Sequence, residues 1–588
     1  MDDQKNFITA MVLSGIVLIG YWFFFGKPLA EQARQQALLE QEQAQAAQVV
    51  TEAPAPIAAR SDAVNTGQRI KIDTPSLSGS FLVTGSRFDD LELKNYKKTL
   101  AADSPNVKLL TPANAEHASY VFDNWTVADG GSGANTPWQH VSGDVLTPET
   151  PVTLAYTTSD FDITRTITVD ERYLVTLEDQ VTNVSTSEIT LERKGAARQH
   201  DLPEDLTNFF ILQEGPIAIV DGQLKDMKYS KIRDKKTLTE SGESGWAGLT
   251  DKYWLTAAIA PQGKTMTANF GYRVLNDRDV YEAGYQLDPV TLTPGATITS
   301  KGYIYAGAKE RRLLESYQSQ ENISRFDLAI DWGTMGILVR PMSTALTFLG
   351  TKLGNFGLGI LALTLIIKIV LFPLFNKQYE SQAKMKKVQP KLKKIQDRYK
   401  DDRMKLQQEM MALYKKEGVN PMSGCLPIIP TIFIFFALYK TVFININLRH
   451  APFYGWIEDL SVRDPLSVLN GFGLFPWDAV PLGFLSFIAI GPLAILYGIT
   501  MAMMQSLTPQ QAGAGEQAEM MMKMMKWMPW IFMFVLAPFA AGLLVYWVWN
   551  NILSFLQQYY ITRKFKVDTP IDELWRRLTK SNTPEAGE

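Results

Sequence analysis

The sequence predicts a polytopic α-helical membrane protein that carries a large all-β domain outside the cytoplasm. Three observations lead to this class. The stretch from Phe7 to Phe25 holds 19 residues without a charge. Several long apolar runs fill residues from about 340 to 562, whereas residues from about 59 to 320 alternate Thr, Val and Tyr at period two. At 588 residues the chain also exceeds what a single hydrophobic core holds, so at least two structural units are expected.

Composition excludes several functions. A net charge of −3 gives no reason to expect sequence-specific nucleic-acid binding. The single cysteine, Cys425, excludes an intramolecular disulfide and a multi-cysteine metal site, and the four histidines are far apart in the sequence. We find no P-loop, GxSxG, HExxH or CxxC pattern. We therefore expect no enzyme activity, no cofactor and no metal site.

The N-terminal 58 residues read as an anchor and a linker. Residues 1–28 contain the uncharged run, which is long enough to cross a bilayer. A cleaved signal peptide is the alternative, but Asp2 and Asp3 outnumber Lys5 ahead of the run, and no clear A-x-A site directly follows it. Residues 29–58 are rich in Ala, Gln and Glu and then punctuated by proline, which is typical of a linker.

Residues 59–322 are expected to form the β domain. The segments SFLVTGSRF, TRTITVDERYLVTLEDQVTN and ATITSKGYIYAG alternate apolar and polar residues and are broken by Gly, Pro, Asn and Asp. This pattern is typical of antiparallel strands with one buried face. About 260 residues of it favour a large sandwich.

The C-terminal half is expected to hold one interfacial helix and five spans. Residues 323–352 include Arg340 and Pro341 in a moderately apolar run, which suits an amphipathic helix lying along the membrane. Residues 520–561 are long enough for two short spans turning near 537–542, although a single span from Trp527 to Trp549 is the alternative. The predicted spans are residues 353–376, 420–445, 481–504, 520–537 and 541–561, and the predicted connections are 377–419, 446–480, 505–519 and the tail 562–588.

Positive charge near the spans predicts their orientation. The segment 377–419 contains thirteen Lys or Arg residues, and the tail after Ile561 is also basic. The loop 446–480 holds only Arg449 and Arg463. By the positive-inside rule, the basic segment and the tail are cytoplasmic and the loop is outside. With the anchor this makes six spans, both termini in the cytoplasm and the β domain outside it.

The basic segment also has a helical seam. Apolar residues at 385, 388, 392, 395 and 399, and again at 406, 410 and 413, repeat at spacings of three and four. Two antiparallel helices joined near Lys400–Asp402 explain this pattern. The segment is either a solvated hairpin or a cationic docking arm for a ribosome, a nascent chain or a targeting factor. The candidate docking residues are Lys384, Lys386, Lys387, Lys391, Lys393, Lys394, Arg398, Lys400 and Arg403.

Methionine is concentrated around the second cytoplasmic segment. Ten of the 21 methionines lie between Met501 and Met533. Methionine is flexible and polarizable, so this region is either ordinary helix packing or a soft surface that accepts varied apolar segments.

Lys368 is the most unusual residue of the apolar runs. A lysine at the centre of a span costs about 2.5–3.5 kcal/mol on insertion scales. Snorkelling of its long side chain toward the cytoplasmic interface is one explanation. The other is a wet cavity, because Thr364 shares its helical face and the last span carries a second polar stripe. The residues of that stripe are Trp547, Asn551, Ser554 and Gln558.

The segments IIKIVLFPLFNKQYESQAKMKKVQPKLKKIQ and EMMALYKKEGVNPMSGCLP resemble the YidC/Oxa/Alb family of membrane protein insertases. The architecture matches along the whole chain, and the sequence matches most strongly over residues 325–565. The resemblance implies a multi-pass protein in the inner membrane of a Gram-negative bacterium. Its β domain would be a periplasmic β-supersandwich similar to sugar-binding and mutarotase-like folds.

The resemblance further implies a hydrophilic groove, open to the cytoplasm and the lipid, that inserts and helps to fold nascent membrane proteins. Lys368 maps onto the charge of this groove, which is usually arginine in the family, and Thr364 and Trp547 map onto facing groove positions. The third and fifth spans would form an apolar slide for the incoming segment. The implied partners are nascent membrane proteins, the bilayer, the Sec translocon, the ribosome and the signal recognition particle with its receptor.

Lysine in place of arginine keeps the positive charge but loses the planar fork that binds a carboxylate with two hydrogen bonds. Two other functions are considered from the sequence. A solute transporter or channel would use the polar stripes, although the internal repeats common in transporters are absent from the sequence. A membrane-anchored protein that binds or modifies sugars would use the β domain as its active part.

Overall fold

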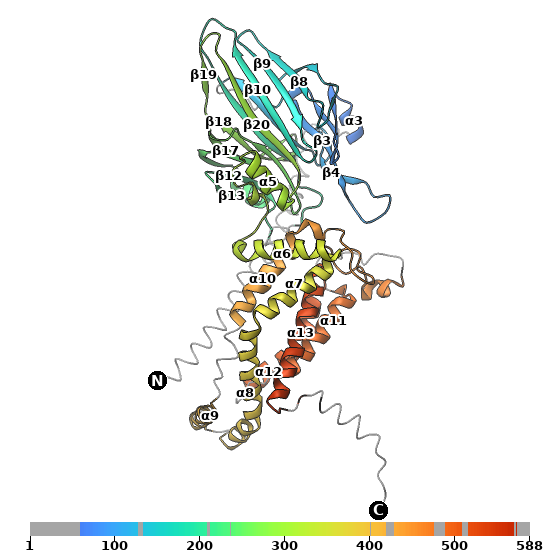
Figure 1. Ribbon diagram of the computed structural model, residues 1–588, viewed down its shortest axis with the longest axis vertical. Helices are drawn as coiled ribbons and strands as arrows, with labels where there is room; N and C mark the ends of the chain where they lie inside the picture. Colours follow the sequence, from blue (N-terminus) through green and yellow to red (C-terminus); the bar gives the residue numbers. More distant parts are fainter. Residues whose placement is uncertain are drawn as a thin grey trace, which may run out of the picture. The chain divides into compact units, whose positions relative to one another are not determined.

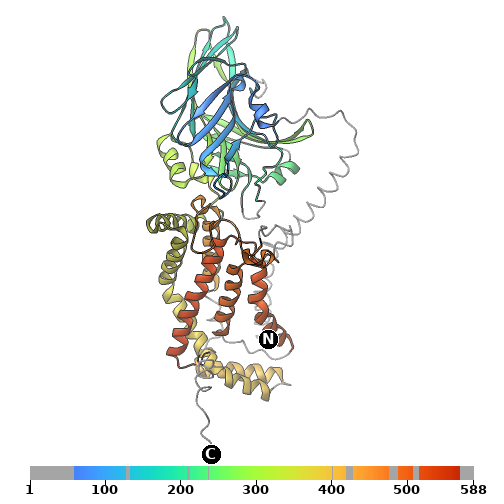
Figure 2. The same cartoon turned by 90° about the vertical axis from the view of Figure 1, so that its right-hand side faces the viewer.

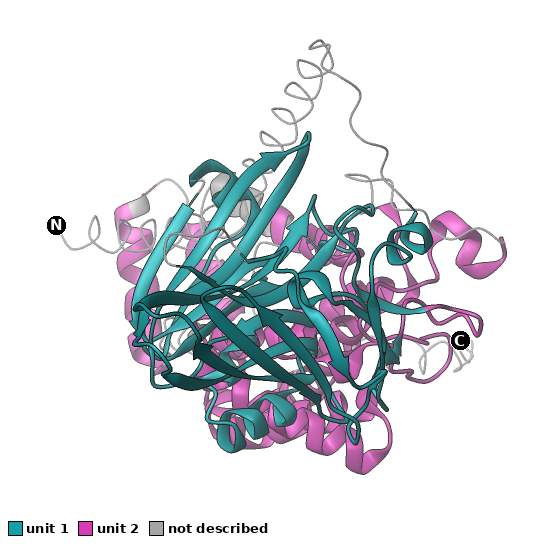
Figure 3. Ribbon diagram, turned by 90° about the horizontal axis from the view of Figure 1, so that it is seen from above, with its two compact units in different colours: residues 1–96, 106–329 teal, residues 97–105, 330–588 magenta. Residues whose placement is uncertain are grey.

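The computed structural model describes residues 59–127, 133–207, 212–235, 237–399, 402–418, 428–475, 488–507, 516–567, 569 and 572. The predicted anchor (1–28), the predicted linker (29–58), Lys400 and Cys425 lie outside these residues. The chain divides into two compact units. The first comprises residues up to Tyr96 together with Asn106–Ala329, and the second comprises Lys97–Pro105 together with the residues from Ile330 onward (Figure 3).

The first unit is built from two β-sheets (Figure 1). The strand β1 pairs with β7 in parallel, whereas it pairs with β2 antiparallel, as do the central strands of both sheets with one another. The 11-stranded sheet has the order β14 (Thr237–Glu243), β17 (Thr265–Leu275), β18 (Arg278–Leu287), β11 (Ile189–His200), β5 (Ser119–Val127), β3 (Arg87–Lys97), β2 (Leu77–Leu82), β1 (Arg69–Asp73) and β7 (Val145–Leu146), with β19 (Val290–Leu292) beside β11 and β4 (Asn106–Leu110) beside β3.

The second sheet of this unit is 9-stranded. Its order is β13 (Gln223–Asp226), β12 (Gly215–Val220), β15 (Gly245–Thr250), β16 (Trp254–Ile259), β20 (Thr297–Ala308), β10 (Leu174–Asn183), β9 (Phe161–Val169), β8 (Val152–Thr157) and β6 (Gln139–Ser142). The short helices of the unit are α3 (Arg60–Val64), η2 (Thr84–Ser86), α4 (Tyr229–Lys235), α5 (Arg311–Gln320) and η3 (Phe326–Ala329).

Strand β9 shows how the alternating pattern makes a sandwich. Every second residue from Phe161 to Val169 is buried and the residues between them are more exposed. Because successive side chains of a strand point to opposite faces, this strand buries one face. The central residue of the buried face is Arg165, which is fully buried, and so the core of the sandwich contains a charge.

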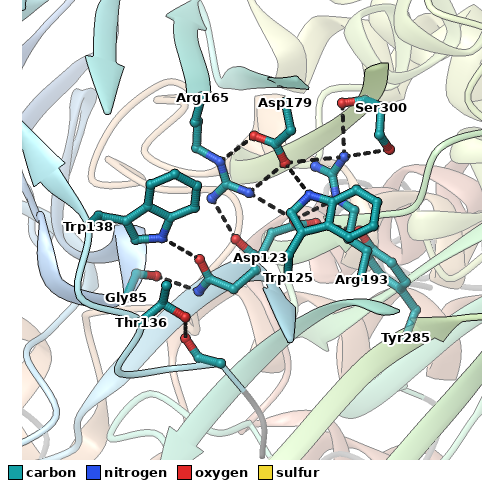
Figure 4. A network of polar contacts seen from close by, with 12 residues as sticks. Gly85, Asp123, Trp125, Thr136, Trp138, Arg165, Asp179, Arg193, Tyr285 and Ser300 are labelled. Atoms are coloured by element: carbon teal, nitrogen blue, oxygen red, sulfur yellow. Dashed lines mark hydrogen bonds and ion pairs between the residues drawn. The ribbon is translucent and has the colours of Figure 1, made fainter. Parts of the chain in front are cut away.

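A network of polar contacts surrounds that charge and joins the two sheets (Figure 4). Arg165 on β9 donates from Nε and Nη2 to the two carboxylate oxygens of Asp179 on β10, at 2.7 and 2.8 Å. Its Nη1 donates to the backbone oxygen of Asp123 on β5, which belongs to the other sheet, at 2.6 Å. Arg193 on β11 donates to Asp123 Oδ1 at 2.7 Å and to Ser300 Oγ on β20 at 2.9 Å. Both arginines and both aspartates are fully buried, so each charge is neutralised within the core.

The predicted boundary between the β domain and the interfacial helix, at 322/323, differs from the structure. The first unit extends to Ala329. The reason is the burial of Phe326, whose ring packs edge-on against Trp246 and Tyr305. The amphipathic helix α6 therefore begins later, at Gly336, and ends at Leu353 with Pro341 inside it.

The second unit is helical. After α6 (Gly336–Leu353), its elements are α7 (Phe356–Val370), α8 (Phe372–Arg398), α9 (Arg403–Glu417), α10 (Ile428–Ile444), η5 (Ile446–Leu448), η6 (Val468–Gly473), α11 (Pro492–Leu507), α12 (Glu516–Leu536) and α13 (Ala541–Lys564). Helix α6 lies across one end of the other helices, and α9 lies at the opposite end beside the far part of α8 (Figures 1 and 2).

Small residues let α6 and α7 approach each other closely. A Cβ atom on Gly359 of α7 would lie 2.9 Å from the backbone nitrogen of Gly350 on α6, and a Cβ on Gly350 would lie 2.4 Å from the Phe356 ring. Asn355 caps the start of α7, where its side-chain oxygen accepts a hydrogen bond from the Leu358 amide at 3.0 Å.

Within the described residues, each helix taken singly is too short or too polar to cross a bilayer, while α7 and α8 together meet the requirement as a pair bent by 70°. The helices α12 and α13 are separate and break between Leu536 and Ala541. The single helix considered over Trp527–Trp549 is therefore absent. At this break the amides of Ala541 and Gly542 donate to the backbone oxygens of Val462 and Leu460, at 2.6 and 2.9 Å.

Candidate functional site

The bend between α7 and α8 begins the site. The sequence predicts one span over 353–376 followed by a separate hairpin, whereas the structure ends α7 at Val370 and starts a continuous helix at Phe372. Pro373 lies in the first turn of α8. Proline has no amide hydrogen, and its ring clashes with the carbonyl four residues earlier, so it starts a helix well and cannot continue one. The 70° bend follows from this residue.

A cavity of about 430 Å³ lies between the bent pair, α10 and α13. Its lining combines amide and hydroxyl side chains with apolar ones, and Lys368 is the single charged residue among the described residues that line it. The lining residues are Thr364, Ile367, Lys368, Leu371, Phe375, Gln378, Tyr379, Gln382, Thr431, Ile432, Ile434, Phe435, Leu438, Met504, Tyr546, Asn550, Ser554 and Gln558.

Lys368 reaches sideways to the facing helix. Its Nζ donates to Ser554 Oγ on α13 at 2.6 Å and lies 4.5 Å from the centre of the Phe375 ring. Ser554 Oγ in turn donates to the backbone oxygen of Asn550 at 2.6 Å, which leaves its lone pairs directed at the ammonium. The hydrogen bond and the cation–π contact together hold the charge inside the cavity. The snorkelling geometry considered for Lys368 is therefore not the one that the structure adopts.

Thr364 lies on the same wall, one turn before Lys368. Its side chain is buried and lines the cavity, and its hydroxyl donates to the backbone oxygen of Ile360 at 2.7 Å. Because the hydroxyl proton is used within the helix, the oxygen lone pairs are what Thr364 presents to the cavity.

The polar stripe of α13 is displaced from the predicted one. Ser554 and Gln558 line the cavity, but Trp547 and Asn551 do not appear among the described lining residues, where Tyr546 and Asn550 stand instead. Asn551 faces α11, where its Nδ2 donates to Thr500 Oγ1 at 3.3 Å. The ring of Trp547 stacks on Phe435 of α10 with centroids 5.4 Å apart. Spacings of four from 546 to 558 follow one face of the helix as well as the predicted spacings of four and three do.

Sequence reasoning missed the polar side chains that α8 contributes. Gln378, Tyr379 and Gln382 line the cavity, and Gln558 Nε2 donates to Gln382 Oε1 at 3.0 Å. The spacing carried a signal, because these residues continue from Lys368 through Leu371 and Phe375 at intervals of three and four. They were instead attributed to the cytoplasmic hairpin, since the helix was expected to end near residue 376.

The hairpin of α8 and α9 packs along the predicted seam. Val388 and Leu392 are buried and contact Met385, Met410 and Leu413. Lys391 Nζ on α8 pairs with Glu417 Oε1 on α9 at 2.7 Å, which adds a polar contact between the two helices. Lys384, Lys387, Lys391, Lys393, Lys394 and Arg398 are exposed and Lys386 is half-buried, whereas Lys400 and the side chain of Arg403 lie outside the described part of the chain.

The methionine-rich region lies on α11 and α12. Met503, Met524 and Met525 are 42–62% exposed, and the neighbouring Trp527 is 64% exposed. Met501 is used in packing, where its sulfur accepts a hydrogen bond from Tyr497 Oη at 3.1 Å. Methionine side chains of this region are thus partly packed and partly exposed, and a surface that accepts varied apolar segments stays a prediction.

These features define a class of protein. It has a helical core with a cavity of mixed polarity, where Lys368 is the one cation among the described lining residues, apolar residues exposed on the outer faces of its helices, and a two-sheet β domain. A family model described as "60Kd inner membrane protein" matches residues 348–569, and one described as "YidC periplasmic domain" matches residues 69–345. Together with curated relatives that are at least 40% identical over 98% of the chain, these matches show that the chain belongs to the YidC family. It is a polytopic inner-membrane protein with a periplasmic β domain.

Curated relatives match along almost the whole chain. A protein of Maricaulis maris named "Membrane protein insertase YidC" is 43% identical over 98% of this chain and 99% of its own length. One of Caulobacter vibrioides with the same name is 40% identical over 98% of both chains. A solved structure titled as an active YidC insertase covers 94% of this chain and 99% of its own, at 15% identity and a TM-score of 0.35. Family membership rests on the sequence matches, and nothing among these relatives favours a transporter or channel.

Proposed function

We propose that this chain is a membrane protein insertase whose cavity receives a short polar or acidic segment of a nascent membrane protein. The observation that carries the proposal is that Lys368 is the one cation among the described residues of a cavity that lies between helices with apolar outer faces. A carboxylate about 4 Å from Lys368 Nζ would gain about 4 kcal/mol at an effective dielectric constant of about 20. This attraction offsets part of the cost of moving a polar segment into the bilayer.

The apolar helix of the substrate supplies the driving force. Burial of about 20 apolar residues in lipid is favourable and needs no nucleotide. The exposed apolar side chains of α10 and α12, such as Phe433 and Ile531, suit a surface along which that helix enters the lipid. In this proposal the cavity handles the polar segment and the outer surface of the helices handles the apolar one.

The proposed topology has six spans, with both termini and the α8–α9 hairpin in the cytoplasm. Support comes from the charge distribution, because the hairpin is cationic and the loop 446–480 contains two basic residues. The bent pair α7–α8 would form the second span of the chain and continue into the hairpin. The protein would work alone or beside the Sec translocon, in the inner membrane of a Gram-negative bacterium.

The exposed cations of the hairpin are proposed to dock a ribosome or the signal recognition particle and its receptor. Six of the candidate docking residues are exposed on α8, and together they make a positive surface that attracts polyanions. Replacing Lys387, Lys391 and Lys394 by Gln should weaken ribosome cosedimentation and leave the amount of protein unchanged. The matched control replaces three exposed lysines of the β unit, Lys108, Lys231 and Lys264. Equal cosedimentation in both sets would contradict the docking role.

Charge variants of Lys368 test whether the cavity attracts acidic segments of a substrate. Insertion of a single-spanning substrate with an acidic tail is compared with that of the same substrate with a neutral tail, in cells that depend on the variant. Lys368→Glu should reduce insertion of the acidic-tailed substrate at least tenfold and affect the neutral one less, and Lys368→Arg should restore it. Full insertion of the acidic-tailed substrate by Lys368→Glu would refute charge attraction. Removal of most of the β domain, residues 59–320, tests whether that domain is accessory to insertion.

A further inference from the structure

Helix α10 forms one wall of the cavity and is fastened on its other side. Thr431, Ile434, Phe435 and Leu438 line the cavity. The last turns of the same helix face α6 and the segment that precedes it. There Lys440, the one charged residue of α10, is 7% exposed, and it does not appear among the described lining residues of the cavity.

Lys440 is held by Asp331, which lies five residues before the start of α6. Lys440 Nζ donates to Asp331 Oδ2 at 2.6 Å, and the two side chains are 8% and 18% exposed. The other carboxylate oxygen, Oδ1, accepts the amide of Gly333 at 3.1 Å. Gly333 has a φ of +63°, and a Cβ atom there would lie 3.6 Å from Lys440 Cε. The aspartate therefore holds both the turn that leads into α6 and the lysine of α10.

Two hydrogen bonds between uncharged groups also join the end of α10 to α6. Thr441 Oγ1 donates to the backbone oxygen of Val339 at 3.4 Å, and Asn445 Nδ2 donates to Thr347 Oγ1 at 3.3 Å. These contacts are long, so the charged pair is the short and strong one of the three. A buried pair of this kind is a poor source of net stability, but loss of one partner leaves an uncompensated charge, which forces the local structure to rearrange.

The side of α10 that faces the cavity contacts α13 through aromatic stacking. Phe435 stacks on Trp547 of α13, and Thr431, Ile434 and Leu438 line the cavity beside it. A helix is stiff over three turns, so a tilt at Lys440 carries Leu438 and Phe435 with it. The spacing between α10 and α13 thus depends on the polar fastening at the end of α10.

We propose that Asp331 and Lys440 are positioning residues that hold α10 at the spacing from α13 at which the cavity accepts a substrate segment. This inference rests on the insertase function proposed above and extends it to residues outside the cavity. The pair acts by setting the position of α10 and not by attracting charged substrate groups, because the ammonium of Lys440 is already neutralised by Asp331. Its effect should therefore be the same for acidic and neutral substrates, unlike that of Lys368.

The test uses the full-length chain in membranes with Asp331→Asn, Lys440→Met and the exchanged pair Asp331→Lys with Lys440→Asp. Each single variant should reduce insertion at least threefold for acidic-tailed and neutral-tailed substrates alike. The exchanged pair should recover at least half of the insertion, since opposite charges face each other again. Failure of the exchanged pair to exceed the single variants, with equal amounts of protein present, would overturn the proposal.

A second measurement reports the spacing directly. Reporter chains carry Cys425→Ser together with cysteines at positions 435 and 547, and the yield of the disulfide between these two positions is measured. These chains are not used in the insertion assay. The yield should fall at least threefold in Lys440→Met and recover in the exchanged pair. If the single variants do not accumulate, the neutral double variant Asp331→Asn with Lys440→Met replaces them, because removal of both charges is tolerated better than removal of one. Unchanged disulfide yield and unchanged insertion in that variant would refute positioning.

The two proposals fail in different ways. If Lys368→Glu spares acidic-tailed substrates while the exchanged pair restores insertion, charge attraction is refuted and positioning stands. If Lys368→Glu reduces insertion of acidic-tailed substrates selectively while the exchanged pair restores no insertion, charge attraction by Lys368 is supported and positioning by Asp331 and Lys440 is refuted.

Discussion

Replacement of Asp179 by Asn tests the charge network that joins the two sheets of the β unit. The carboxylate accepts both nitrogens of the Arg165 fork and the indole of Trp125, the latter at 2.9 Å, and it lies 3.5 Å from Arg193 Nη1. Burial alone would raise the pKa of Asp179, but the two guanidinium groups outweigh it and hold the pKa below its usual value. The group is therefore charged at neutral pH, and Asn removes that charge while keeping its shape.

The magnitude follows from the burial of the network. All four charged side chains are fully buried, so the lost charge leaves Arg165 and Arg193 sharing Asp123 alone. Breaking a buried ion pair costs about 3–5 kcal/mol. For a unit of this size a change of 1 kcal/mol shifts the melting temperature by about 2–4 °C. We therefore expect a loss of about 6–20 °C.

The assay is thermal unfolding of the full-length chain in detergent, followed by near-ultraviolet circular dichroism, to which the immobilised indole of Trp125 contributes. Asp288→Asn is the matched control, because Asp288 is exposed and its replacement should change the unfolding free energy by less than about 0.5 kcal/mol. A loss below about 2 °C for Asp179→Asn would refute the reasoning, since it would mean that the network does not depend on this charge.

Three further predictions concern single side chains. Ser554→Ala removes the hydrogen-bond partner of Lys368 and should lower insertion of acidic-tailed substrates, while Ser554→Thr restores it; equal insertion by both variants would contradict a role for the hydroxyl. Burial and the nearby carboxylate of Glu214 raise the pKa of Asp251 to about 7, against the opposing ammonium of Lys309, so the folded unit holds a proton that the unfolded chain releases. The stability contributed by Asp251 should thus fall as the pH rises from about 4 to 7, and Asp251→Asn should remove this part of the pH dependence of the melting temperature; an unchanged slope would contradict the shift. Gly359→Ala places a methyl group 2.9 Å from the Gly350 nitrogen and should cost about 1–3 kcal/mol, whereas Gly271→Ala, with open space around it, is the control; similar melting temperatures for the two would argue against tight packing of α6 on α7.

Much of the architecture could be predicted from residue patterns. Alternation at period two, as in Phe161–Val169, marks strands with one buried face, and spacings of three and four mark the seam of the hairpin at Val388 and Leu392. Both patterns are local, because they depend on which face of a single element is buried. The family could also be recognised from the sequence, because the two motifs that contain Pro373 and Cys425 are each continuous in the chain.

The site was predicted less completely. Lys368, Thr364, Ser554 and Gln558 meet at one cavity, whereas Trp547 and Asn551 turn toward α10 and α11. Helical spacing specifies the face of a helix only to within one residue. Which of two adjacent residues lines the cavity depends on which helix packs on each side of α13. The polar residues of α8 were missed because the first span was expected to end near residue 376, whereas a continuous helix starts at Phe372, after the bend at Leu371.

By itself, the sequence determined that a cation lies within an apolar run, that a polar stripe lies on the last helix, and that a β domain precedes them. These are properties of composition and period. The tertiary structure alone decided that the ammonium of Lys368 meets Ser554, that Asn550 replaces Asn551 on the cavity wall, and that Lys440 pairs with Asp331. The physical reason is that such contacts join residues more than 100 positions apart, and their partners are chosen by how whole helices pack.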